Sequence, residues 1–264
     1  MANLSNIKVK LLNKDIASII INEPKTYNAL SLKNLGDLIK AFKKLDEDKN
    51  IKVIIIEGSG KGFSAGHNLK EVSGLKKREK YQKLFNLCSK LMLQIVEGKK
   101  PVIAKVHGAA FAAGCQLVAS CDLAYSSNDA IFATPGVNIG LFCSTPMVAV
   151  SRKVNRKRMM QMLLTGEPIK ANYAKEIGLI NNHFSKSKLN NEVLKVAKTI
   201  ASKSSLTIKI GKQTFYNPAA YQASLHRFGV GMDSLRPPEK RAARHLLASS
   251  HAGHMQSHPG LRYG

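Results

Sequence analysis

Two runs of small residues, each between an apolar β-rich stretch and a potential helix, constrain the fold most. They are residues 63–71 (FSAGHNLKE) and 107–117 (HGAAFAAGCQL). Backbone N–H groups at a helix start lack intrahelical partners, and small residues allow another group to approach them closely. If the two junctions face each other, they can hold one oxygen anion between two N–H donors. The sequence therefore predicts an anion-stabilising site built from backbone.

The rest of the sequence predicts strands alternating with helices. Stretches rich in Ile and Val predict strands at 7–21, 51–57, 101–106 and 121–126. Helices are expected at 31–45, 113–120, 152–164 and 189–201. The first of these carries apolar residues at helical spacing, namely Leu35, Leu38, Ile39, Phe42 and Leu45. This recurrence predicts an α/β fold made of stacked β-β-α turns, with a partly helical C-terminal region.

Three segments are expected. Residues 1–185 should form the core that holds the site, and residues 186–216 a helical C-terminal region. Residues 217–264 form a divergent basic tail that is expected to be partly disordered. Before Asn217, 31 of the 35 basic residues are lysine, whereas five of the six after it are arginine. This change suggests foreign or frame-shifted coding sequence, or a genuinely divergent tail.

Composition excludes some classes of protein. At 264 residues and 44% apolar, the chain can bury a large core. It has no apolar run of the roughly 18 residues that span a membrane. Residues 1–6 lack signal and presequence features, so a cytoplasmic location is expected, or the mitochondrial matrix in a eukaryote. Four cysteines without a CxxC pair are expected to be buried, reduced thiols. The net charge of +24 favours anionic partners, or it reflects a lysine-rich coding bias.

Several motifs, in order, resemble the enoyl-CoA hydratase (crotonase) superfamily from about residue 7 to residue 216. They are residues 28–31 (NALS), 63–71, 107–122 and 165–168 (TGEP), followed by Ala174, Gly178 and Leu179. Residues 64–71, 113–117 and 132–142 are most similar to the branch of enoyl-CoA hydratase domain-containing protein 3. The resemblance implies a crotonase-like spiral and a role in acyl-CoA and fatty-acid metabolism, as a lyase or isomerase.

The same resemblance implies which residues form the site. The two oxyanion-hole donors fall on the backbone N–H groups of His67 and Ala113. Contacts to coenzyme A fall on Lys25, Ala29, Ala65, His67, Asn68, Leu69 and Lys70. Coenzyme A would be part of the thioester substrate, and no permanently bound cofactor or metal is expected. The resemblance also implies a homotrimer or hexamer, although the tail lacks the amphipathic helices that would pack at such an interface.

The two glutamates that hold water in a hydratase fall on Gln116 and Gly136. An amide can orient water but cannot exchange a proton near neutral pH, and glycine has no side chain. General acid–base help contributes roughly 10²–10⁴-fold, so hydration is expected to be weak or absent. His67 could carry the proton or act as a structural hydrogen-bonder. Glu71 could orient His67 or cap a helix, and Cys143 could be a nucleophile or a buried thiol.

Three alternatives remain for function. Decarboxylation of a malonyl-type thioester needs an oxyanion hole but no base, because loss of CO₂ forms the enolate. A non-catalytic acyl-CoA binder would need the pocket alone. RNA binding would use Lys33, Lys40 and Lys44, which share one helical stripe in the sequence.

Overall fold

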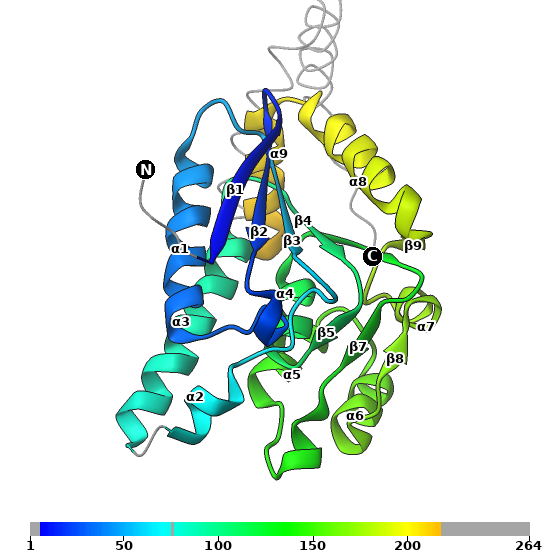
Figure 1. Ribbon diagram of the computed structural model, residues 1–264. Helices are drawn as coiled ribbons and strands as arrows, with labels where there is room; N and C mark the ends of the chain where they lie inside the picture. Colours follow the sequence, from blue (N-terminus) through cyan, green and yellow to red (C-terminus); the bar gives the residue numbers. More distant parts are fainter. Residues whose placement is uncertain (1–5, 75–76, 218–264) are drawn as a thin grey trace, which may run out of the picture. The chain divides into compact units, whose positions relative to one another are not determined.

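The computed structural model describes residues 6–74 and 77–217, and its main feature is a six-stranded sheet (Figure 1). The strand order is β1-β2-β3-β4-β6-β9, in which only β1 and β2 pair antiparallel. A three-stranded sheet of order β5-β7-β8 lies beyond it. The strands are β1 (Ile7–Asn13), β2 (Ile16–Ile21), β3 (Val53–Gly58), β4 (Val102–Val106), β5 (Ala109–Phe111), β6 (Leu123–Ser127), β7 (Ile131–Ala133), β8 (Ile169–Lys170) and β9 (Asn182–Phe184).

Helices connect these strands. The α-helices are α1 (Leu32–Glu47), α2 (Leu69–Gly74), α3 (Arg78–Glu97), α4 (Ala113–Ser120), α5 (Ser144–Val150), α6 (Arg156–Thr165), α7 (Ala171–Glu176), α8 (Lys186–Ala201) and α9 (Ser205–Tyr216). Two 3₁₀ helices, η1 (Pro24–Thr26) and η2 (Pro135–Ile139), lie in loops. The expected α/β succession of strand and helix turns is therefore present, and α8 and α9 occupy the expected helical region.

Both faces of the central strands β2, β3 and β4 are covered, which explains why these strands are almost continuously apolar. On β3, Ile54 and Ile56 join the larger core, whereas Val53 and Ile55 face the other side. The larger core includes the buried stripes of α1, α3 and α4, and α8 covers the opposite face. Figure 1 shows α1 and α3 on one side of the strands and α8 on the other.

Three sequence-based expectations need correction. The apolar stretch 7–21 is not one strand but an antiparallel hairpin, because the polar pair Lys14-Asp15 forms its turn. The helix expected from residue 152 begins at Arg156, where the Asn155 side chain accepts a hydrogen bond from the N–H of Arg158. The long helix α3 was not predicted at all. The expected tail, apart from Asn217, lies outside the described residues.

Three lysines bind the C-terminal ends of helices, where backbone carbonyls lack intrahelical partners. The Lys100 ammonium donates to the carbonyls of Leu45 and Asp48 at the end of α1. Lys52 donates to Ala201 O at the end of α8, at 2.9 Å. Lys212 donates to Ile95 O near the end of α3, at 2.8 Å. Part of the high lysine content therefore stabilises the fold.

Lys212 also forms an ion pair that fixes α9 to the sheet. Its ammonium lies 2.7 Å from Asp122 Oδ2 and 2.8 Å from Lys100 O, and the side chain is only 5% exposed. The same Asp122 oxygen accepts the N–H of Val102 at 2.7 Å, at the start of β4. The buried Lys212 ammonium thus links α9, the last described helix, through Asp122 to the starts of β4 and β6.

We predict that Lys212→Met lowers the free energy of unfolding by about 3 kcal/mol, because it leaves the half-buried Asp122 carboxylate without its counter-charge. Urea unfolding measures the change. Lys209→Met is the matched control on the same helix and should change stability by less than about 0.5 kcal/mol. Equal losses in the two variants would contradict a special role for Lys212.

Candidate functional site

The two small-residue loops follow the C-terminal ends of β3 and β4 and run side by side. The N–H of Phe111 donates to Ser64 O at 2.9 Å, and the N–H of Ser64 donates to Ala109 O at 3.1 Å. Ser64 and Ala110 form an isolated parallel bridge. A Cβ added to Gly114 would lie 2.2 Å from Ser64 O, so only glycine permits this approach. The predicted facing of the two junctions is confirmed.

The backbone N–H groups of His67 and Ala113 lie on either side of this contact. A Cβ on Gly66, next to His67, would lie 3.1 Å from the nitrogen of Ala113. Ala113 is the first residue of α4, and its N–H has no intrahelical acceptor. Among the described residues, neither N–H has a hydrogen-bond partner.

The turn before Ala113 has an unusual conformation. Ala112 has φ 47° and ψ −116°, a region that normally favours glycine. Its own N–H donates to Ala133 O at 2.9 Å, which holds the turn against β7. The strained backbone of Ala112 thus directly precedes the N–H group of Ala113.

Asn28 holds the first small-residue loop in place through hydrogen bonds, a role that the sequence did not predict. It is fully buried at φ 57°, and its Nδ2 donates to Ser59 O and Gly62 O, both at 2.8 Å. Its backbone carbonyl accepts from Ser64 Oγ at 2.9 Å. Asparagine tolerates the left-handed region better than most residues. The sequence signal that could have indicated this role is that an asparagine begins the NALS motif at residues 28–31.

The His67 side chain is turned away from solvent and packs on α3. Its Nδ1 lies 3.1 Å from Leu30 O, and its ring meets Phe85 edge-on with centroids 5.6 Å apart. Its Nε2 is buried without a partner in the described part of the chain. Burial lowers the pKa of His67, although the Leu30 carbonyl and the Glu71 charge oppose that shift. These contacts favour the structural alternative, with a neutral ring at neutral pH.

Glu71 caps a helix, but not the one in which it lies. Its Oε2 accepts the N–H of Leu32 at 3.1 Å, at the start of α1. The start of α2 is instead capped by Asn68, whose Oδ1 accepts the N–H groups of Lys70 and Glu71 at 3.1 and 3.3 Å. Of the two alternatives for Glu71, the geometry favours capping.

The two positions without glutamates differ in their surroundings. Gln116 is buried in α4, and its Oε1 lies 3.9 Å from Cys88 Sγ. A Cβ on Gly136 would lie 2.8 Å from Leu141 O and 2.9 Å from Cys143 Sγ. The loop that follows Gly136 therefore occupies the space that any side chain there would need.

The cysteines are all free and buried, as expected. The N–H of Gly136 donates to Cys143 Sγ at 3.3 Å. Burial raises the pKa of Cys143, against the opposing effect of that N–H. Burial also raises the pKa of Cys88 to about 12. A protonated thiol is a weak nucleophile, so the geometry favours a buried thiol over a covalent role for Cys143.

The residues assigned to coenzyme A gather in neighbouring segments. The N–H of Ala65 donates to Tyr27 O at 2.9 Å, and the N–H of Leu30 donates to Gly66 O at 2.7 Å. These bonds place the segment of Lys25 and Ala29 beside the loop that leads into α2. Ala29 is buried, whereas Lys25, Ala65, Leu69 and Lys70 are exposed and Asn68 is half-buried. Their contacts with coenzyme A stay a prediction.

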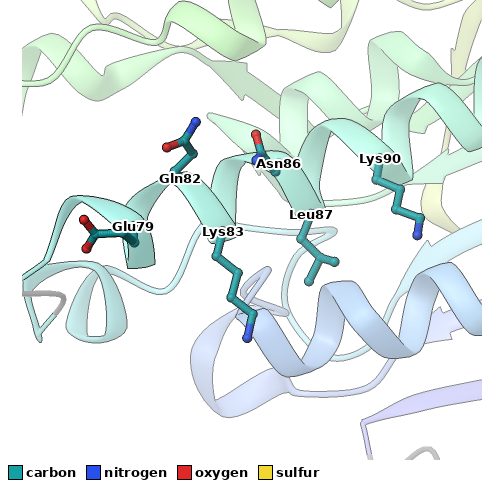
Figure 2. Close-up of a pocket in the computed structure, with 6 residues that line it drawn as sticks. All are labelled: Glu79, Gln82, Lys83, Asn86, Leu87 and Lys90. Carbon is teal, nitrogen blue, oxygen red and sulfur yellow. The ribbon is translucent and has the colours of Figure 1, made fainter.

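Other features lie apart from the loops. A cavity of about 400 Å³ is lined by α3 alone, and Figure 2 shows Lys83, Leu87 and Lys90 on one side of that helix. Lys33, Lys40 and Lys44 lie on α1, where Lys40 pairs with Asp37 at 3.7 Å.

Within residues 6–74 and 77–217, no group of three or more His, Cys, Asp or Glu is placed to hold a metal. No helix in the same ranges is long and apolar enough to cross a membrane.

Comparison with known proteins identifies relatives along most of the chain. The family model described as enoyl-CoA hydratase/isomerase matches residues 12–230. The rat mitochondrial enoyl-CoA hydratase domain-containing protein 3 is 47% identical over 201 residues, which is 76% of this chain and 67% of that protein. The human counterpart is also 47% identical over 201 residues, covering 76% of this chain and 66% of that protein. The chain thus spans about two thirds of these relatives' length.

Solved structures resemble this one closely. An enoyl-CoA hydratase from Mycobacterium smegmatis has a TM-score of 0.83 at 39% identity, covering 92% of this chain and 96% of its own. The human enoyl-CoA hydratase domain-containing protein 3 has a TM-score of 0.81 at 39% identity, covering 93% of this chain and 98% of its own.

We predict that Gly136→Ala lowers the free energy of unfolding by about 1–3 kcal/mol, because its Cβ overlaps the Leu141 carbonyl and the Cys143 sulfur. Gly36→Ala is the control. Gly36 lies within α1 with open space around its Cβ position, so alanine should raise stability by about 0.5–1 kcal/mol. Chemical unfolding of both variants measures the difference, and a neutral Gly136→Ala would contradict the crowded loop.

A second prediction concerns pH. A folded-state pKa of His67 below its unfolded value means that the unfolded chain binds more protons as pH falls below about 6.5. Unfolding free energy should therefore fall from pH 7 to pH 5, and His67→Gln should lose part of that dependence. At pH 8 the ring is neutral in both states, so protonation of His67 should contribute nothing there. An unchanged slope in His67→Gln would rule out this titration.

Proposed function

The chain belongs to the enoyl-CoA hydratase/isomerase family, and from that premise we propose that it binds an acyl-coenzyme A thioester between its two small-residue loops. The thioester carbonyl oxygen would accept hydrogen bonds from the N–H groups of His67 and Ala113. The observation that carries this proposal is that both N–H groups lack partners among the described residues while they flank one close loop contact. The crotonase-like fold is confirmed by the solved relatives.

Such an arrangement favours chemistry in which negative charge develops on the thioester oxygen. Preorganised backbone donors stabilise that charge without moving during the reaction. Removal of one such donor typically lowers the rate about 10²–10³-fold. The bonds between residues 63–64 and 109–111 hold the two loops together. Formation of an enolate from an acyl-CoA is the step that this site supports best.

The site lacks the acid and base that hydration needs. The side chain at position 116 is an amide, and the Gly136 position is crowded by Leu141 O and Cys143 Sγ. No carboxylate therefore stands at either position to move a proton to or from water. We propose weak or absent hydratase activity, with acyl-CoA binding retained.

A second candidate is decarboxylation of a malonyl-type acyl-CoA, and the crowding at Gly136 favours it. Loss of CO₂ leaves its electron pair on the α-carbon, and that pair delocalises onto the oxygen held by the two donors. A proton from solvent then completes the product, so no side-chain base is required. Unchanged malonyl-CoA and methylmalonyl-CoA, in samples that bind them, would contradict this candidate.

Other properties are proposals of the same kind. Coenzyme A would enter as part of the substrate and not as a permanent cofactor. The rat and human relatives are named as mitochondrial proteins, which supports the matrix alternative over the cytoplasm. Family membership supports a homotrimer or hexamer. Binding of RNA through Lys33, Lys40 and Lys44 remains a proposal that no contact of these lysines specifically supports.

The direct test is titration calorimetry with crotonyl-CoA, followed in the same sample by the loss of enoyl absorbance. We expect binding with little or no hydration. Rapid hydration would mean that another group replaces the glutamates, and absence of binding would contradict the proposed site.

Gly66→Ala tests the two-donor arrangement. Its Cβ would lie 2.9 Å from Phe111 O and 3.1 Å from the Ala113 nitrogen, in the space beside the second donor. We expect crotonyl-CoA affinity to fall at least about tenfold, as expected for the loss of about 1.4 kcal/mol. Gly178→Ala is the matched control, because Gly178 also has a positive φ (83°) but follows α7, away from the loops. Equal loss of affinity in both variants would indicate general destabilisation and not a local effect.

A further inference from the structure

A cavity of about 350 Å³ lies at the N-terminal ends of β3 and β4, on the side of the sheet away from the two small-residue loops. It is formed by the end of α1, the turns that lead into β3 and β4, and the junction of α8 and α9. The loops of the proposed acyl-CoA site follow the other ends of the same strands. The two sites therefore share no residues. We call this space the lysine cavity.

Its lining carries an excess of positive charge. Six lysines line it, against three carboxylates, Asp46, Glu47 and Asp48. Two of the carboxylates already accept backbone hydrogen bonds. Asp46 Oδ1 accepts the N–H of Lys99 at 2.8 Å, and Asp48 Oδ1 accepts the N–H of Asn50 at 2.9 Å. The six lysines exceed the three carboxylates of the lining by three charges, and outside the lining Asp15 Oδ2 lies 4.0 Å from Lys52 Nζ.

Four of the lysines have no ion pair with another described residue. Lys52 and Lys100 bind helix-end carbonyls, as described above. In the described part of the chain, no carboxylate lies within ion-pair distance of the other four, which are Lys49, Lys99, Lys203 and Lys209. These ammonium groups come from three separate segments that surround one space.

The start of α9 adds backbone donors to the same cavity. Ser204 Oγ accepts the N–H of Thr207 at 3.3 Å, which leaves the N–H groups of Ser205 and Leu206 without partners among the described residues. The positive end of a helix favours phosphate groups. The lining also has an apolar part, in which Ile51 and Pro101 are buried and Ile200 and Ile208 are half-buried.

We propose that the lysine cavity binds a nucleoside polyphosphate. The phosphate chain would lie against the lysines and the start of α9, and the base would lie against the apolar side chains. A monocarboxylate would leave most of the excess positive charge unmatched, whereas a polyphosphate matches it. The volume lies near the lower end of the range found for small-molecule sites, about 300–1,000 Å³. The proposal does not depend on the acyl-CoA site.

The test is titration calorimetry of the full chain with ATP, tripolyphosphate and adenosine in about 150 mM salt, where long-range attraction is screened. We expect ATP to bind more tightly than tripolyphosphate, and adenosine to bind weakly. Lys203→Glu with Lys209→Glu should weaken ATP binding at least about tenfold, because it removes two charge-assisted contacts. Ile208→Ser should weaken ATP binding but leave tripolyphosphate binding unchanged.

The control variant is Lys195→Glu with Lys198→Glu, on the exposed face of α8 and outside the cavity. It changes the net charge equally and should retain ATP binding. Equal weakening in the two double variants would overturn the proposal, since attraction to the overall charge would then explain binding. Displacement of ATP by crotonyl-CoA would also overturn the proposal. So would tighter binding of a single-stranded RNA oligonucleotide than of ATP, if the Lys203 and Lys209 substitutions abolish that RNA binding. Failure of crotonyl-CoA binding alone would leave it standing.

Discussion

The close approach of two backbone segments, residues 63–66 and 109–114, is the constraint on which the candidate site depends. Gly114 permits it, because any Cβ there would overlap Ser64 O. Asn28 then fixes the first segment through the carbonyls of Ser59 and Gly62. The N–H groups of His67 and Ala113, which have no partner in the described part of the chain, lie directly after the first segment and within the second. The Asn28 side chain therefore contributes to this region by holding backbone in place.

The unusual charge of the chain has more than one role. Lys52, Lys100 and Lys212 bind carbonyls at the ends of three helices and thereby join segments far apart in sequence. A lysine-rich coding bias alone does not account for lysines that occupy buried or half-buried structural positions. The remaining lysines around the lysine cavity have no such function in the described structure. Lysines that bind helix ends and lysines without an ion pair in the described residues thus line the same cavity.

The sequence was informative where local patterns decide structure, and less so where distant residues meet. Apolar spacing located α1, and the small-residue loops were placed correctly. The missed α3 had a usable signal, since Leu84, Cys88, Leu91 and Ile95 recur at helical spacing, but charged and polar residues between them interrupt its apolar character. Glu71 caps a helix start 39 residues away, and Lys212 meets Asp122 across 90 residues. No local pattern predicts such partners, because they are set by the packing of the whole fold.

The crowded surroundings of Gly136 also bear on how this protein can change over evolution. A new side chain at this position would meet the main chain of Leu141, which a single substitution does not move, in addition to the Cys143 sulfur. Acquisition of a carboxylate at position 136 would therefore require the segment 137–143 to be rebuilt first. The packing of residues 137–143 against Gly136 thus restricts which substitutions at this position the fold can accept without a coupled change in its neighbours.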